Sequence, residues 1–317
     1  MKNKTVRAIA LCMILLCLSA LVGCGASTEK KNKVSVVCAL FPPYDFLREI
    51  TAGEEQIELT LLLKPGQESH DYDPSSKDIL KIHECDLFVY GGGESDNWID
   101  RVLQSVDTEY KTVISLMDTV NPLATETVEG MEHDHEEHHE ETEYDEHVWT
   151  DPENAITIVK ALQAALGKID PNNAETYRTN ASAYITKLQT LDAEFEQTVN
   201  TASRRTVVVA DRFPLLYFCK AYDLTYYAAF SGCAASVEPS SATVQFLIDT
   251  VKKEQIPAVF QMELSAGALA STIAENTGCK VKTFYSCHNL TQQDFDNGET
   301  YLSLMQKNVD ALKEVLN

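Results

Sequence analysis

The chain has 317 residues, of which 44% are hydrophobic and 23% are charged, so its composition is that of a folded globular protein and excludes general disorder. Its 48 acidic side chains outnumber its 26 lysines and arginines and give a formal net charge of -22 at pH 7. A field of that sign repels nucleic acid and favours cations as ligands. The length allows one large domain or two of ordinary size.

The first 23 residues have the pattern of a secretory signal peptide. Three basic residues precede the apolar run Ala8–Val22, which is shorter than the roughly 20 residues of a bilayer-spanning helix. The run ends in Leu-Val-Gly-Cys, which resembles the lipobox of bacterial lipoproteins, where cleavage leaves the cysteine as a lipid-modified first residue. We therefore expect a lipid anchor at Cys24, a polar tether over 24–33 and a location on the extracytoplasmic face of the cell membrane. An uncleaved anchor helix is the alternative.

The mature chain alternates strand-like apolar runs with helical segments. In its first part the pattern predicts strands over 34–38, 57–63, 86–90 and 112–116, and helices over 44–51, 75–83 and 98–106.

Two Asp-Pro pairs follow, at 151–152 and 170–171, and each predicts a helix start because Asp is a favoured N-cap and Pro a favoured first helical residue. The second helix is predicted to run to about Ala202. It contains no glycine, and its apolar residues recur at steps of three and four.

The alternation then resumes. The last part of the chain predicts strands over 207–210, 225–230, 258–262 and 281–285, and helices over 213–222, 239–254, 266–277 and 299–315. This order predicts an α/β fold with two lobes, each with a mostly parallel sheet of about four strands, joined by one long helix. The predicted divisions are an N-terminal lobe over 34–169, a connecting helix over 170–203 and a C-terminal lobe over 204–317.

A tract rich in acid and histidine interrupts the first lobe. Eleven carboxylates lie between Glu126 and Glu146, and the same stretch contains four of the eight histidines: His133, His135, His138 and His139. Such a tract cannot bury a core, so we expect a solvated loop that binds metal weakly as an accessory site, or that only solubilises the protein. Residues 135–139 also match the HExxH pattern of zinc peptidases. Between Met131 and Tyr144 there is no apolar residue, so a helix there would have no apolar face to bury. This disfavours a zinc peptidase.

Three further histidines lie in loops between predicted strands and helices: His70, His147 and His288. Open α/β sheets bind ligands at the carboxyl ends of their strands, so histidines at comparable positions in two lobes indicate one binding site. His83 falls inside a predicted helix and is assigned a structural role.

Several segments together point to a family. They are Pro-Gly at 65–66 with His-Asp-Tyr-Asp-Pro at 70–74, the acidic tract, His-Val-Trp-Thr-Asp-Pro at 147–152, and Tyr-Leu-Ser-Leu-Met at 301–305 with Asn308. In this order they resemble the zinc/manganese substrate-binding lipoproteins of ABC transporters that have a rigid helix between their lobes. The resemblance implies a metal ion held in the cleft as transported solute and delivered to an ABC permease. It also implies that His70 and His147 are ligands, and that a histidine-rich loop marks a member specific for Zn²⁺ rather than Mn²⁺.

The second lobe departs from the family pattern. Relatives place a His or Glu after the first strand of this lobe, where the chain reads Ala210-Asp211, and many place an Asp near the last strand, where it reads Ser-Cys-His288. We expect His288 and then Asp211 as ligands, with Glu263 as the third choice. Three imidazoles and one carboxylate suit four-coordinate zinc, whereas manganese prefers oxygen ligands.

The predicted function is therefore capture and delivery of a metal ion and not catalysis, since no GxSxG motif or pairing of a nucleophile with a base is present. A manganese-binding member and an adhesin-like surface protein remain as alternatives. Six cysteines of the mature chain permit disulfides in an exported protein: Cys38, Cys85, Cys219, Cys233, Cys279 and Cys287.

Overall fold

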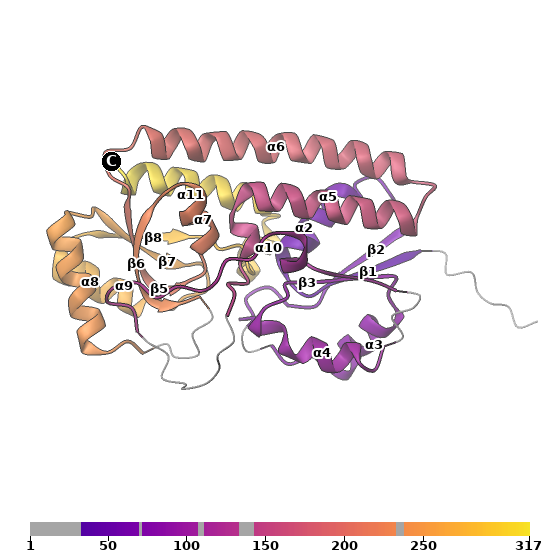
Figure 1. The fold of residues 1–317 in the computed structure, drawn as a ribbon, viewed down its shortest axis with the longest axis horizontal. Helices are drawn as coiled ribbons and strands as arrows, with labels where there is room; N and C mark the ends of the chain where they lie inside the picture. Colours follow the sequence, from indigo (N-terminus) through magenta and orange to yellow (C-terminus); the bar gives the residue numbers. More distant parts are fainter. Residues whose placement is uncertain (1–32, 70–71, 107–110, 133–142, 233–237) are drawn as a thin grey trace, which may run out of the picture. The chain divides into compact units, whose positions relative to one another are not determined.

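The computed structural model describes residues 33–69, 72–106, 111–132, 143–232 and 238–317. Contacts divide the chain into Met1–Lys33 and a compact unit, Val34–Asn317. The second unit contains two four-stranded sheets, and every strand pairing within them is parallel (Figure 1). The predicted α/β class with two lobes is confirmed. The predicted signal peptide and Cys24 lie outside the described residues.

The first lobe is built on a sheet with the order β2-β1-β3-β4. Its strands are β1 (Val34–Cys38), β2 (Ile57–Leu61), β3 (Leu87–Tyr90) and β4 (Thr112–Ser115), and its helices are α2 (Phe41–Ile50), α3 (Ser76–Glu84) and α4 (Asn97–Leu103). Helix α2 begins at Phe41, three residues before the predicted start. Prolines 42 and 43 do not interrupt it because the first turn of a helix needs no N–H donors.

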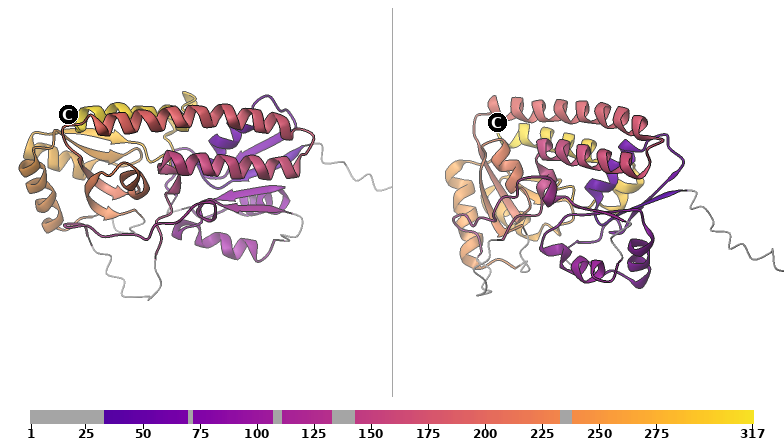
Figure 2. Two further views of the ribbon diagram at one scale, coloured as in Figure 1. Left: turned by 45° about the horizontal axis from the view of Figure 1, so that its top comes forward. Right: turned by 45° about the vertical axis from the view of Figure 1, so that its right-hand side comes forward.

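Two antiparallel helices follow, α5 (Pro152–Ile169) and α6 (Ala174–Asn200). Helix α6 begins at Ala174 and not at the predicted Asp-Pro pair, since residues 171–173 form a turn in which Asp170 accepts a hydrogen bond from the Asn173 side chain. Its 27 residues extend about 40 Å at 1.5 Å per residue. It runs beside both lobes (Figure 2).

Side-chain contacts of α6 show how it joins the lobes. Near its start, Asn180 donates to the carbonyls of Ile50 and Ala52 at the end of α2. Near its end, Asp192 accepts a hydrogen bond from Tyr222, and Glu194 accepts one from Gln306.

The second lobe has the strand order β6-β5-β7-β8. Its strands are β5 (Thr206–Phe213), β6 (Thr225–Ser231), β7 (Ala258–Met262) and β8 (Lys280–Phe284), and its helices are α7 (Leu216–Ala221), α8 (Ser241–Glu254), α9 (Ala268–Thr277), α10 (Gln292–Asp296) and α11 (Tyr301–Val315). Strand β5 continues past the predicted end at Ala210, because Arg212 and Phe213 pair with β6 after a register shift. Asp211 therefore lies within the strand and not in the loop after it.

One hydrophobic core includes buried residues of both lobes. It contains Phe46 and Phe88 of the first lobe, Phe218 and Phe284 of the second, and Leu188 of α6. A smaller cluster fills the space between the second sheet and helices α8 and α9. Within the described residues, no helix is apolar enough over a sufficient length to span a membrane.

Five cysteines lie in the described part of the chain: Cys38, Cys85, Cys219, Cys279 and Cys287. Cys233 lies outside the described residues. No disulfide joins any of the five described cysteines to another.

Candidate metal centre

A cavity of about 420 Å³ lies between the loops of the two lobes. The first lobe contributes Glu68, Ser69 and His147 to its wall, and the second contributes the carboxyl ends of β5, β6 and β7 and the loops that follow β7 and β8. These loops leave the carboxyl ends of their strands, which is the position at which open parallel sheets bind ligands.

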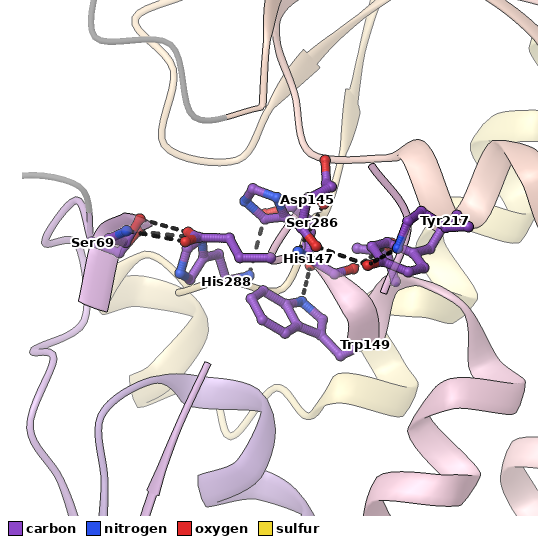
Figure 3. A network of polar contacts seen from close by, with 11 residues as sticks. Ser69, Asp145, His147, Trp149, Tyr217, Ser286 and His288 are labelled. Carbon is purple, nitrogen blue, oxygen red and sulfur yellow. Dashed lines mark hydrogen bonds and ion pairs between the residues drawn. The ribbon is translucent and has the colours of Figure 1, made fainter. Parts of the chain in front are cut away.

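His147 is buried at the end of the segment that precedes α5, with 1% of its surface exposed. Its Nδ1 lies 3.1 Å from Oδ1 of Asp145, which also accepts the backbone N–H of His147 at 2.8 Å (Figure 3). Tyr217 fixes this turn in place because its hydroxyl donates to the Asp145 carbonyl. Because Asp145 engages Nδ1, Nε2 is the ring nitrogen that could bind a metal ion.

Two opposing effects act on the pKa of the His147 imidazole. Burial lowers the pKa, but the charge of Asp145 and its hydrogen bond raise it, and the net shift is upward. The same carboxylate that orients the ring also makes it more basic, which would strengthen a bond from the deprotonated nitrogen to a metal ion.

His288 reaches the site from the loop after β8 and is 9% exposed. Its Nδ1 lies 3.3 Å from the Ser69 hydroxyl, and its ring centroid lies 5.1 Å from that of His147 (Figure 3). The indole N–H of Trp149 donates to the Ser286 carbonyl at 2.8 Å and ties this loop to the His147 segment. The two imidazoles predicted from separate lobes therefore lie side by side.

Glu146 completes a group that the sequence did not single out. One oxygen of Glu146 and one nitrogen each of His147 and His288 lie within 4.8 Å of one another, and all three residues are buried. Ser95 fixes the carboxylate through its backbone N–H at 3.1 Å and its hydroxyl at 2.5 Å. A Cβ at Gly93 would collide with the Glu146 side chain, so the close approach requires glycine.

The two other predicted carboxylates line the cavity but are not members of this group. Asp211 accepts hydrogen bonds from the backbone N–H groups of Arg212 and Met262, which joins β5 to β7. Glu263 accepts the N–H and the hydroxyl of Ser286, each at 2.9 Å. Burial raises the pKa of Glu263 to about 7 despite these hydrogen bonds.

The remaining predicted residues are not brought into the described site. His70 follows Ser69 directly but lies outside the described residues, as do the tract histidines His133, His135, His138 and His139. His83 lies on α3, where its ring is 3.2 Å from the Ser105 hydroxyl.

Two imidazoles and a carboxylate, all buried, form a donor set that suits zinc. Zinc accepts nitrogen and oxygen ligands, and a tetrahedral site needs one more donor. The Glu146 carboxylate is buried, and it would offset the charge of a bound dication.

A sequence model described as "Zinc-uptake complex component A periplasmic" matches residues 36–315. The chain belongs to this family.

Among curated members of the zinc-uptake family, "Zinc-binding lipoprotein AdcA" of Streptococcus pneumoniae is 33% identical over 96% of this chain and 60% of its own length. "High-affinity zinc uptake system protein ZnuA" of Bacillus subtilis is 29% identical over 92% of this chain and 90% of its own length. The chain thus spans about 60% of the length of the AdcA relative that it matches.

A solved structure shares the fold. The Zn(II)-bound ZnuA-like domain of S. pneumoniae AdcA superposes with a TM-score of 0.73 at 30% identity and covers 90% of this chain and 99% of that domain. The family resemblance noted in the sequence is confirmed by these similarities.

Proposed function

We propose that this protein is an extracytoplasmic solute-binding lipoprotein that captures a zinc ion between its lobes and delivers it to an ABC permease. The observation that carries the proposal is the buried group of Glu146, His147 and His288, in which three donor atoms from two lobes lie within 4.8 Å of one another. Family membership supports it, since the family is described as a component of zinc uptake.

The proposed ligand set is His147 and His288 with a carboxylate from Glu146, and His70 as the fourth donor. Asp211 stays an alternative carboxylate because it lines the same cavity. His70 enters through the family resemblance and through its place after Ser69, whose hydroxyl contacts His288. Four such donors would close the coordination shell, as suits a protein that transports its metal and does not use it to activate water.

Zinc is preferred to manganese because imidazole nitrogens suit zinc and oxygen-rich sites suit manganese. The names of the curated relatives support this choice, since both mention zinc. The name "lipoprotein" given to AdcA supports a lipid anchor at Cys24 and a place on the outer face of the cell membrane. The tract histidines are proposed as an accessory that raises the local metal concentration.

The experiment is a metal titration of residues 33–317, purified without added metal. We expect one tightly bound zinc per chain by elemental analysis, and weaker binding of manganese in competition with the same chelator. His147→Ala should lose the tight site. Preference for manganese would support the manganese-binding alternative, and no tight metal at all would leave the adhesin-like alternative. Zinc-dependent peptide cleavage would instead support the peptidase.

A further inference from the structure

The loop after β8 contacts both segments of the first lobe that reach the cavity. It holds Cys287 in the left-handed region at φ 60°, a conformation that non-glycine residues adopt rarely and that tertiary contacts must maintain. On one side, the Ser286 carbonyl accepts the indole N–H of Trp149. On the other side, the loop meets the segment Lys64–Ser69, which follows β2.

Asn289 makes the second of these connections. Its side chain is 2% exposed, and its amide nitrogen donates to the carbonyls of Lys64 at 2.7 Å and Gln67 at 2.8 Å. Both amide hydrogens are therefore used, and the amide oxygen accepts the N–H of Leu290. The backbone makes a further hydrogen bond between the same two loops, in which the Gly66 N–H donates to the Leu290 carbonyl at 2.7 Å.

These contacts lie next to the candidate donors. The segment held by Asn289 continues to Ser69, whose hydroxyl lies 3.3 Å from Nδ1 of His288. His288 itself is the residue before Asn289. The Asn289 amide thus connects the loop after β2 to the loop after β8. The connection lies beside the contact between Ser69 of the first lobe and His288 of the second.

We propose that Asn289 is a positioning residue that sets the zinc affinity by holding the loop after β2 against the loop after β8. This inference rests on the proposed zinc-binding function. The contact between the Ser69 hydroxyl and Nδ1 of His288 fixes the orientation of the His288 ring, and outer contacts of this kind typically change metal affinity about 10–100-fold. Without the Asn289 amide, the loop would have to become ordered when zinc binds. The entropy lost in that step would lower the zinc affinity.

The test compares Asn289→Asp with Asn180→Asp. Aspartate has the size of asparagine but presents only acceptors, so in each variant two carbonyls lose their donor. Asn180 makes the same pattern of contacts, to the carbonyls of Ile50 and Ala52 at 3.0 Å each, and none of these three residues lines the cavity. Zinc dissociation constants come from chelator competition and stabilities from melting temperatures of the metal-free chains.

We expect Asn289→Asp to bind zinc about 10–100-fold more weakly than the unchanged chain, mainly through faster release, while Asn180→Asp keeps its affinity. If Asn289→Asp does not fold, Asn289→Ser, which removes the same donors without adding charge, replaces it. Equal zinc affinities of the two variants would overturn the inference. Failure of the unchanged chain to bind zinc would refute the proposed function and the inference with it.

A second readout separates positioning from general loss of stability. If Asn289 acts through the position of Ser69, then Ser69→Ala should weaken zinc binding in the unchanged chain and have little further effect beside Asn289→Asp. The same Ser69→Ala change should keep its full effect beside Asn180→Asp. Additive effects in both backgrounds would show that Asn289 does not act through this loop.

Discussion

At the scale of single residues, Glu146 stands out because its carboxylate is both buried and held by hydrogen bonds from a neighbouring residue. It is 2% exposed, and Ser95 donates to both of its oxygens. Each carboxylate oxygen retains a further lone pair, which a metal ion can use. A charged group that is buried in this way is stabilised by a neighbouring dication.

We expect Glu146→Gln to weaken zinc binding more than 100-fold, beyond the roughly 10–100-fold effect of outer contacts. Glutamine keeps the size of the side chain and an acceptor for Ser95 but removes the charge. Asp211→Asn is the matched change, and it should affect stability more than zinc binding because Asp211 joins β5 to β7. Chelator competition on both variants measures the difference. A larger loss in Asp211→Asn would assign the carboxylate ligand to Asp211.

The buried group has three candidate donors, and the sequence predicts two of them, His147 and His288. The difference from Glu146 has a physical reason. His147 and His288 are single histidines in loops between predicted elements, so the local sequence is enough to identify each as a candidate ligand. Glu146 is one of eleven carboxylates in a single stretch. What distinguishes it is its contact with Ser95 and the space left by Gly93, and both come from a segment about 50 residues away that no local pattern connects to it.

At the scale of elements, the joint between α2 and α11 depends on a buried acid. Asp45 of α2 is fully buried, accepts the N–H of Tyr301 at the start of α11 at 2.8 Å, and contacts Arg48. Burial raises the pKa of Asp45 to about 6, against the lowering effects of Arg48 and the Tyr301 N–H. The folded protein therefore holds this proton more tightly than the unfolded chain does.

The sign of the resulting pH dependence follows from linkage. Between the unfolded pKa of 3.8 and the folded value of about 6, the native state binds more protons, so stability decreases as pH rises through this window. At higher pH the cost is on the order of 3 kcal/mol, at about 1.4 kcal/mol per pKa unit. We expect Asp45→Asn to gain stability relative to the unchanged chain as pH rises from 4 to 8. Denaturant unfolding across this range measures the gain, and parallel profiles would contradict it.

The elements themselves were largely predictable, and the exceptions have local causes. Short apolar runs between helical segments predict every strand of both sheets. The reason is that strands of a parallel sheet are buried on both faces and are therefore apolar along their length. Helix α2 starts three residues before the predicted start because its first turn tolerates prolines 42 and 43, which would break a helix further along. The end of β5 was missed because Arg212 is polar but pairs with Phe230 of the neighbouring strand.

At the scale of the whole molecule, the two sheets share their main hydrophobic core, and a smaller cluster lies between the second sheet and helices α8 and α9. Buried side chains of both lobes and of α6 form one contiguous cluster, so neither lobe can be removed without exposing the apolar surface of the other. Burial of apolar surface is the dominant favourable contribution to folding. The lobes are therefore expected to unfold together in spite of their separate sheets.

The shared core has a calorimetric consequence. A metal-free chain with two independent lobes would show two heat-absorption peaks, but we expect a single peak with a calorimetric enthalpy equal to the van't Hoff enthalpy. Two resolved peaks would contradict this. With one transition, zinc bound at the loops stabilises the entire chain by mass action, so saturating metal should move the whole peak to higher temperature. Heat stability would then report, in a single reading, whether the proposed metal ion is bound.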